Sequence, residues 1–191
     1  RMPSFLAMSF EGALTPSFDM RCLFPGRTPP DGWGIGFYPG QEPAATIIKE
    51  PSPATMSVKS QLVKSWEHLE SSLCVMHIRQ ARWGSLAESN TQPFMRSWGG
   101  RDWMFVHSGS LDDRPELDPD APFEPVGSTD TELVFCDLMT RFARRGWKRL
   151  RDADPVEVQS WLRPFDETGV LTCALSDGSD LLVYCDGQGQ Q

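Results

Sequence analysis

Short apolar segments separated by turn-forming residues dominate the first half of the chain. Five of them match the length of a β-strand and are short for a helix; they span residues 5–10, 33–38, 45–49, 72–80 and 103–107. Pro25-Gly26 and Pro29-Pro30 break any regular pattern between the first two segments. The pattern predicts a fold with several buried strands.

Apolar residues at helical spacing mark other segments. Residues 57–69 carry them at Val58, Leu62, Val63, Trp66 and Leu69. Residues 129–145 should form a longer helix, because Thr129 and Glu132 have the spacing of a capping box. A third helix begins at Asp154-Pro155, and Gly169 is the signal for its end.

The last two apolar segments, 170–175 and 181–185, flank turn-forming residues at 176–179 and predict a hairpin. Strands come first, helices next and the hairpin last, which predicts an α+β fold with mostly antiparallel sheets. No repeat or linker divides the 191 residues, so we expect a single domain over residues 1–191.

Composition narrows the choice of partners. A hydrophobic content of 39% and seven tryptophans indicate a globular chain. The net charge of -8 and the pI near 4.9 argue against nucleic acid or an anionic membrane as partner. The basic run between Arg141 and Arg151 is an exception with two explanations: cations at the end of a helix, or an anion site.

We expect a cytoplasmic protein. No apolar run approaches the ~18 residues of a membrane span, and the start lacks the features of a signal peptide. The five cysteines (Cys22, Cys74, Cys136, Cys173 and Cys185) are scattered, which is typical of reduced, buried thiols. Neither they nor the three histidines show metal-ligand spacing, so we expect no metal and no cofactor.

Arg79 and Asp130 are suited to hold the two charged groups of a free amino acid. A guanidinium binds a carboxylate through two parallel hydrogen bonds. Asp130 stands at a predicted helix start, where the helix dipole favours a carboxylate that can pair with an ammonium group. Both residues also have a purely structural explanation, as a strand-end ion pair and a helix-start residue.

Five short motifs occur in an order that resembles the class II (N-terminal nucleophile) glutamine amidotransferases. They are Asp31-Gly32-Trp33-Gly34, the segment from His77-Ile78-Arg79 to Gly84, Asn90-Thr91-Gln92-Pro93-Phe94, Gly127-Ser128-Thr129-Asp130-Thr131-Glu132 and Ser176-Asp177-Gly178. The resemblance covers most of the chain and is strongest to the small stand-alone bacterial members. It implies a four-layer αββα sandwich of the N-terminal nucleophile hydrolases, with the family's last strands missing from these 191 residues.

The resemblance also implies a binding site. It assigns Arg79 to the α-carboxylate of glutamine and Asp130 to its α-ammonium group, with Asn90, Thr91, His107 and Trp33 as further substrate-binding residues. The family carries His-Asn-Gly where this chain has His107-Ser108-Gly109. Ser108 and Gly109 are therefore the candidate donors to the oxyanion, and serine offers a shorter donor than asparagine.

The nucleophile departs further from the family, whose mature chains begin with cysteine and use its free α-amine as the base. Aligning residues 5–9 with the family's opening strand places Pro3 at that position, and proline has no nucleophilic side chain. Ser4 is the candidate nucleophile only after cleavage behind Pro3. Cys22 lies in a turn-rich loop and is expected to be structural.

Two functional hypotheses follow. The first is a domain that binds glutamine or a γ-glutamyl amide, with reduced or absent glutaminase activity. The second is an active amidohydrolase or amidotransferase that gains its nucleophile by processing. As protein partners the resemblance implies a second copy of the chain or a synthase or ligase domain, and we expect neither nucleic acid nor membrane.

Overall fold

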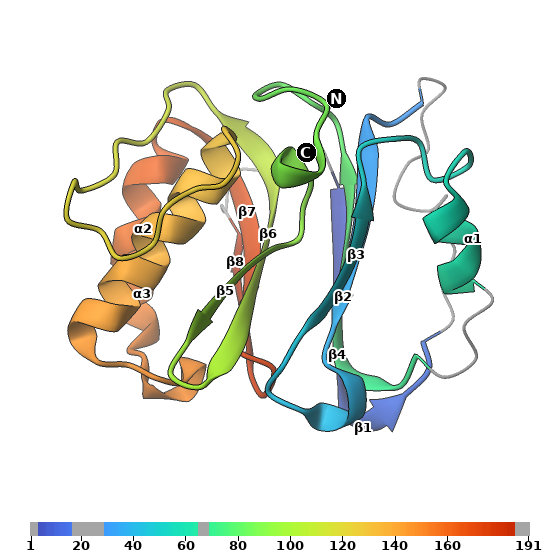
Figure 1. Ribbon diagram of the computed structural model, residues 1–191. Coiled ribbons are helices and arrows are strands. Elements are labelled where there is room, and N and C mark those ends of the chain that lie inside the picture. The colour runs from blue at the N-terminus through green and yellow to red at the C-terminus, as the bar shows by residue number, and fades with distance from the viewer. Residues whose placement is uncertain (1–3, 17–28, 65–68, 186–191) are drawn as a thin grey trace.

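Two antiparallel sheets face each other and carry helices on their outer sides (Figure 1). The computed structural model describes residues 4–16, 29–64 and 69–185. The first sheet has the order β1-β4-β2-β3 and the second has the order β5-β6-β7-β8. The predicted α+β architecture with antiparallel sheets is therefore confirmed.

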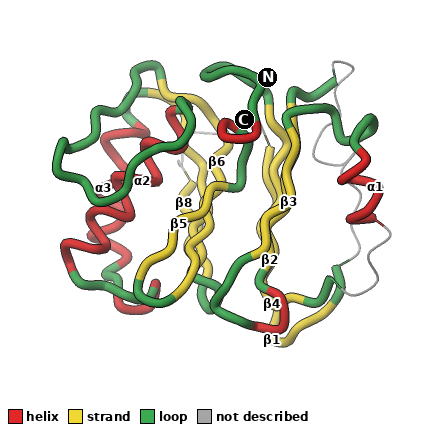
Figure 2. The backbone as a smooth tube through the Cα atoms, viewed as in Figure 1, coloured by secondary structure: helices red, strands yellow, loops and turns green. Residues whose placement is uncertain are grey.

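The strands of the first sheet are β1 (Ser4–Leu14), β2 (Gly32–Phe37), β3 (Thr46–Glu50) and β4 (Ser71–Arg79). Those of the second sheet are β5 (Phe94–Trp98), β6 (Arg101–Leu111), β7 (Gly169–Ser176) and β8 (Leu181–Cys185). The loops that follow β4 and β6 lie at the same end of the molecule, at the top of the view in Figure 2. Side chains from the ends of both sheets can therefore meet there.

In the described residues, three α-helices cover the outer faces: α1 (Val58–Lys64) beside the first sheet, and α2 (Asp130–Arg145) and α3 (Pro155–Asp166) beside the second (Figure 1). Short 3-10 turns are η2 (Pro39–Gln41), η3 (Glu88–Asn90) and η4 (Leu150–Asp152). The helix predicted over 57–69 is present as α1 in the described part of that range, and residues 65–68 lie outside the described part of the chain.

Both ends of α2 follow from its sequence. The Thr129 hydroxyl accepts a hydrogen bond from the Glu132 N–H, and Gly146 closes the helix with a φ of 70°. The second half of the predicted capping box does not form among these residues. The Glu132 carboxylate instead accepts from the N–H groups of Val126 and Gly127 and pairs with Arg96 at 2.6 Å. The cation holds Glu132 away from the helix start, so the capping-box prediction was half right.

The strands alternate between two environments. The layer between the sheets contains Tyr38, Leu73, Val75, Met104, Val106 and Ala174. The residues that alternate with them, such as Trp103 and Phe105 in β6, pack outward under α2 and α3. The Tyr38 hydroxyl reaches across the layer and donates to the carbonyl oxygens of Asp102 and Ser176, at 3.0 and 3.1 Å. This alternation decides which side chains can enter a site between the sheets.

Strand β5 was not predicted. It is short, and only one of its outward-facing side chains, Phe94, is fully buried. Its hairpin with β6 turns at Gly99 and Gly100, both with positive φ. The glycine pair between Trp98 and Arg101 was the available signal.

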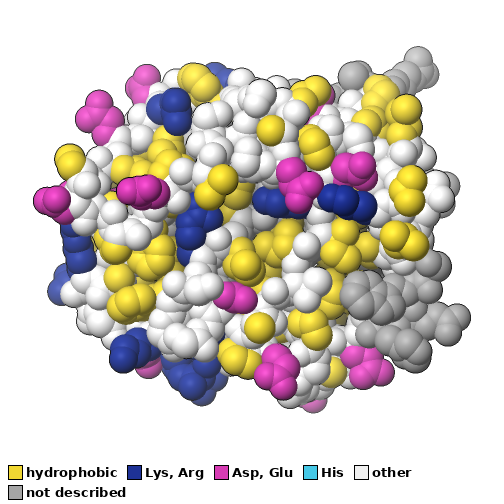
Figure 3. Space-filling view, viewed as in Figure 1, with side chains coloured by type: hydrophobic (Ala, Val, Ile, Leu, Met, Phe, Trp, Pro, Cys, Tyr) yellow, Lys and Arg dark blue, Asp and Glu magenta, His cyan; other side chains and the backbone are white. Residues whose placement is uncertain are grey.

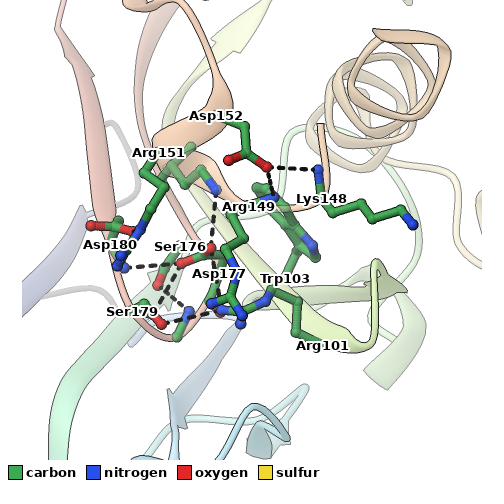
Figure 4. A network of polar contacts seen from close by, with 12 residues as sticks. Arg101, Trp103, Lys148, Arg149, Arg151, Asp152, Ser176, Asp177, Ser179 and Asp180 are labelled. Atoms are coloured by element: carbon green, nitrogen blue, oxygen red, sulfur yellow. Dashed lines mark hydrogen bonds and ion pairs between the residues drawn. The ribbon is translucent and has the colours of Figure 1, made fainter. Parts of the chain in front are cut away.

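The turn between β7 and β8 is held by a buried carboxylate (Figure 4). Asp177 accepts hydrogen bonds from the N–H groups of Leu150, Ser179 and Asp180, and it pairs with Arg101 at 3.3 Å. Neither partner of this ion pair is more than 8% exposed in its side chain. The Ser-Asp-Gly motif is thus a structural junction in the described residues, far in sequence from the candidate site.

Candidate functional site

A small polar pocket lies where the end of β4, the end of β6 and the first turn of α2 meet. Of the residues predicted for the site, four line this pocket: Arg79, Asn90, Gly109 and Asp130. The remaining lining residues are His77, Gln80, Ala81, Arg82, Trp83, Gln92, Ser110, Thr129 and Thr131. Ser4 at the start of β1 pairs with Ile78 in β4, so the pocket lies near the beginning of the described chain.

Arg79 uses one half of its guanidinium and leaves the other half without a described partner. Its Nη2 donates to the carbonyl oxygens of Trp83 and Ser85, each at 3.1 Å. Its Nη1 is buried and makes no hydrogen bond with any described residue. Burial lowers the pKa of this guanidinium, and the Asp31 carboxylate opposes that effect. An arginine stays protonated under such conditions, so a buried cation faces the pocket.

Asp130 is the first residue of α2, and the backbone holds its carboxylate in place. Its Oδ2 accepts from the Leu111 N–H at 2.8 Å and its Oδ1 from the Thr131 N–H at 2.9 Å. Within the described residues, no ion pair joins Asp130 to Arg79, although both line the same pocket. Each carboxylate oxygen has a second lone pair, so Asp130 can still accept from a ligand.

His77 is a second buried polar group in the pocket without a partner. Its side chain is 1% exposed, and neither ring nitrogen makes a hydrogen bond with a described residue. Burial, together with the neighbouring His107 and Arg79, lowers the pKa of His77 to about 3. His77 is therefore neutral near pH 7. Buried polar groups without partners are rare, and a ligand or a water molecule is the usual explanation.

His107 does not line the pocket, although it was predicted to bind substrate. Both ring nitrogens are occupied: Nδ1 lies 2.9 Å from the Thr131 hydroxyl and Nε2 lies 3.0 Å from the Val170 carbonyl oxygen. Burial lowers the pKa of His107, against the opposing effects of the Val170 carbonyl and Asp130. The ring therefore connects β6 with β7 and with the start of α2.

Gly109 lines the pocket in a conformation that other residues rarely adopt. Its φ is +137°, and an added Cβ would lie 1.8 Å from the Val170 carbonyl oxygen. Ser108 precedes it and alternates with His107, so its side chain points to the opposite side of β6. That side faces the first sheet, as the packing of Met104 and Val106 shows.

Asn90 and Thr91, at the end of η3, are hydrogen-bonded to neighbouring parts of the chain. The Asn90 amide donates to the Ser85 carbonyl oxygen at 3.1 Å and accepts from the Ser128 N–H at 2.7 Å. Thr91 is fully buried, donates to the Ala87 carbonyl oxygen at 3.0 Å and is not part of the lining. Both ends of the Asn90 amide are therefore already engaged by the chain.

The side chains of Ser4 and Trp33 point away from the pocket, although both residues pair with Ile78 of β4. Leu6 and Met8 pack on the outer side of the first sheet, so the alternation of β1 directs Ser4 to that same outer side. Trp33 is fully buried in the same outer cluster, and its Nε1 has no described hydrogen-bond partner. Neither residue is brought together with Arg79 and Asp130.

The segment that follows β4 closes the pocket. The Trp83 Nε1 donates to the Leu111 carbonyl oxygen at 3.1 Å, and Arg82 pairs with Asp112 at 3.1 Å, so the segment is fastened to the end of β6. The pocket is partly open to solvent and has a volume of about 30 Å³. That is close to the ~30 Å³ that one water molecule occupies in the liquid. A ligand of the size of glutamine can enter only if this segment moves.

His77, Gln92 and Thr131 were missed as lining residues. Each lies in one of the recognised motifs, from which other residues were predicted to form the site. For His77 the signal was a polar residue that continues the apolar run from Leu73 to Met76. A polar residue within a buried strand needs a partner, and that partner is often functional.

The basic run at the end of α2 does not form a free cationic patch. Four of its arginines make ion pairs, Arg141 with Asp137, Arg144 with Asp118, Arg145 with Glu157 and Arg151 with Asp180. The face of the molecule shown in Figure 3 likewise mixes cationic, anionic and apolar side chains. These pairs favour the helix-end explanation over an anion site.

Cys74, Cys136 and Cys173 are buried free thiols, the Cys185 side chain is exposed, and Cys22 lies outside the described residues. None of the four described cysteines lines the pocket. In the described segments, no three His, Cys, Asp or Glu side chains gather as a metal ion would require. No described helix is both long and apolar enough to cross a membrane.

A sequence model of the family described as "Glutamine amidotransferases class-II" matches residues 2–190. The Escherichia coli (strain K12) protein "Putative glutamine amidotransferase YafJ" is 36% identical over 157 residues, covering 81% of this chain and 60% of that protein. The "Putative glutamine amidotransferase" of Haemophilus influenzae is 29% identical over 156 residues, covering 81% of this chain and 52% of that protein. The chain thus spans roughly half the length of these curated relatives.

Comparison with solved structures also finds glutamine amidotransferases. The crystal structure described as a "predicted glutamine amidotransferase from Pseudomonas aeruginosa PA01" aligns with a TM-score of 0.59 and 30% identity, covering 97% of this chain and 71% of that one. A class-II domain protein from Silicibacter pomeroyi, at 15% identity and a TM-score of 0.54, shares the fold. Sequence and fold comparisons therefore agree.

Proposed function

Because the chain belongs to the class II glutamine amidotransferases, we propose that it binds glutamine or a γ-glutamyl amide in the pocket between Arg79 and Asp130. We further propose that it hydrolyses the side-chain amide slowly or not at all. The family relation gives the class of ligand, and the pocket gives the residues that would hold it.

One observation carries the binding proposal: a buried cation and a buried carboxylate line one pocket without neutralising each other. Arg79 Nη1 has no described partner, and both Asp130 oxygens retain a lone pair beyond their backbone hydrogen bonds. An α-amino acid presents a carboxylate and an ammonium group a few bonds apart, so it complements both. A pair kept only for stability would be expected to make a direct ion pair.

Two features support weak hydrolysis. Ser108 stands where the resemblance expects an asparagine donor to the oxyanion, and loss of one such donor costs ~3 kcal/mol, or roughly 100-fold to 1000-fold in rate. Pro3 stands at the position that the resemblance gives to the cysteine nucleophile, and none of the described thiols lines the pocket. The nucleophile and the oxyanion donor both act when the tetrahedral intermediate forms, so the loss of either one slows that step.

We also assign the helix–sheet–sheet–helix arrangement of Figure 1 to the αββα sandwich of N-terminal nucleophile hydrolases. The buried thiols of Cys74, Cys136 and Cys173 support the proposal of a reducing, cytoplasmic environment. As protein partner we propose a second copy of the chain or a synthase or ligase domain, on the strength of the family relation.

Calorimetric titration with glutamine tests the binding proposal. We expect Arg79→Met and Asp130→Asn each to weaken glutamine binding about 10-fold to 150-fold, the loss of one charged hydrogen-bonding partner. Arg163→Met removes an equally charged but exposed side chain and should leave the affinity unchanged. The binding proposal is wrong if the unmodified protein gives no heat of binding, or if Arg79→Met binds as tightly as the control.

Ammonia release from glutamine tests the hydrolysis proposal. We expect the unmodified chain to release little ammonia. A chain that starts at Met2 and carries Pro3→Cys should gain activity, and Ser108→Asn should add about 10-fold to 100-fold. Robust release by the unmodified chain that Ser4→Ala abolishes, and Cys22→Ala does not, would instead establish an active hydrolase with Ser4 as nucleophile.

A further inference from the structure

Gln92 forms a two-point pair with the backbone of β6. Its side chain is buried, its Oε1 accepts from the His107 N–H at 2.6 Å, and its Nε2 donates to the His107 carbonyl oxygen at 3.2 Å. In the register of the β5–β6 hairpin, Phe94 lies opposite Phe105, so residue 92 falls opposite residue 107. The Gln92 side chain therefore continues the ladder beyond Pro93, which has no N–H to donate.

The same amide begins a buried chain of hydrogen bonds with a single direction. The Val170 carbonyl can only accept, so His107 Nε2 carries the hydrogen and Nδ1 of the neutral ring is an acceptor. The Thr131 hydroxyl then donates to Nδ1 at 2.9 Å and accepts from Gln92 Nε2 at 3.4 Å. A hydrogen bond from this hydroxyl to Asp130, at 3.5 Å, is the longer alternative.

We propose that Gln92 is a positioning residue for the ligand site, because its neutral amide holds β6 and the first turn of α2 in the arrangement that brings Gly109 and Asp130 to the pocket. The proposal rests on the proposed function for its ligand. Gln92 itself lines the pocket and contacts both elements, so its loss releases them together.

The role requires a donor and an acceptor on one side chain. An ionised carboxylate at this position can accept from the His107 N–H but leaves the His107 carbonyl and the Thr131 hydroxyl without a donor. A protonated carboxyl group offers both again. The titratable and charged groups around this position are His107 from β6, Asp130 from α2, His77 and Arg79 from β4, and Lys49 from β3. The Lys49 Nζ donates to the carbonyl oxygens of Thr91 and Pro93, on either side of Gln92. The pKa of His77 is about 3, so His77 gains no charge as the pH falls from 8 to about 5.5. Burial also lowers the pKa of His107, which disfavours its charged form.

Gln92→Glu is therefore a variant whose defect should depend on pH. At about pH 8 we expect it to bind glutamine at least about tenfold more weakly than the unmodified protein, and at about pH 5.5 to recover to within about threefold. Gln92→Met lacks both hydrogen-bonding groups and should bind weakly at both values. Gln159→Glu makes the same substitution at an exposed position of α3 and should match the unmodified protein throughout.

The ring nitrogens of His107 provide a readout that needs no ligand. Nitrogen-15 spectra of the unmodified protein should show the Nε2–H form of His107 across this pH range. In Gln92→Met the Thr131 hydroxyl loses the Gln92 donor, which alters its hydrogen bond to His107 Nδ1. We therefore expect the Nδ1 resonance to shift, while Nε2 keeps the hydrogen that it donates to the Val170 carbonyl. A purely space-filling role for Gln92 would leave the His107 spectrum unchanged and would give Gln92→Glu no pH-dependent recovery.

The outcomes separate this proposal from the proposed function. If the unmodified protein does not bind glutamine, the proposed function fails, and the His107 spectra still decide the role of Gln92. Unchanged His107 spectra in Gln92→Met, or tight glutamine binding by Gln92→Glu at about pH 8, would overturn the proposal. If Gln92→Met does not fold, the pH series of Gln92→Glu decides alone.

Discussion

A methyl group added at Gly109 tests how closely β6 and β7 approach beside the pocket. The Cβ of Gly109→Ala would lie 1.8 Å from the Val170 carbonyl oxygen and 2.8 Å from His107 Nε2. Both neighbours are held in place, because Val170 belongs to the β6–β7 ladder and His107 is fixed by its two ring contacts. Gly100→Ala is the matched control, since Gly100 also has a positive φ but nothing within 4 Å of the added atom.

Gly109→Ala should lower the stability more than Gly100→Ala does. Forcing a residue with a side chain into a rarely populated backbone region costs about 1–3 kcal/mol, and both variants bear this cost. Gly109→Ala also has to displace a strand, which adds about 1–3 kcal/mol or more. We therefore expect a loss of about 2–6 kcal/mol for Gly109→Ala, out of a total stability of about 5–15 kcal/mol.

Urea unfolding followed by tryptophan fluorescence measures the difference. With a slope near ~2 kcal/mol per molar, Gly109→Ala should lower the unfolding midpoint by about 1–3 M, and Gly100→Ala by about 0.5–1.5 M. Equal midpoints for the two variants would refute the close approach of Gly109 to Val170. In that case the oxyanion-side geometry of β6 would also need revision, since Gly109 lines the pocket.

Three further predictions concern the joint between the sheets, the closed pocket and acid stability. Tyr38→Phe removes the hydroxyl that donates to two buried carbonyl oxygens, and chemical unfolding should show a loss of about 1–3 kcal/mol. Trp83→Phe removes the Nε1–H that bonds the Leu111 carbonyl, so stopped-flow mixing should show glutamine association faster by about 2-fold to 10-fold, while an unchanged rate would mean that this contact does not hold the pocket shut. The pKa of His77 is about 3 in the folded protein and near its ordinary value when unfolded, so the unfolded state binds the proton first as the pH falls. Between about pH 6.5 and 3 the free energy of unfolding should therefore fall by up to about 1.4 kcal/mol per pH unit because of this residue, and His77→Gln should remove that slope in acid titrations of stability.

Local sequence signals were sufficient for much of the fold. The helix predicted from Thr129 to about Arg145 is present as α2, with Thr129 as its cap and Gly146 closing its end. The continuous apolar runs were predicted as strands from their length and the turn-forming residues between them, and they form strands in the structure. Strand β5 was missed because Met95 and Ser97 are exposed and Arg96 interrupts the apolar character, so its hairpin partner defines it.

The site was less predictable, because strand alternation decides which side chains meet. Arg79 and Asp130 stand at element ends that the two-sheet packing brings to one pocket. Ser4 and Trp33 lie close to it along the chain or in a motif, but their strand positions turn them to the outer side of the first sheet. A shift of one residue in register would reverse every such assignment, and the sequence alone does not give the register.

The polar groups of the pocket that lack hydrogen-bond partners indicate where a ligand would make its strongest contacts. On the side of β6 and α2, Asp130, His107 and Gln92 are held by the chain before any ligand arrives. On the side of β4, Arg79 Nη1 and both nitrogens of His77 lack described partners. The first side is therefore preorganised, and the second is where a bound carboxylate gains most, since it satisfies a buried cation that already bears its desolvation cost. Because the closing segment continues directly from β4, that same interaction can couple ligand binding to closure of the pocket.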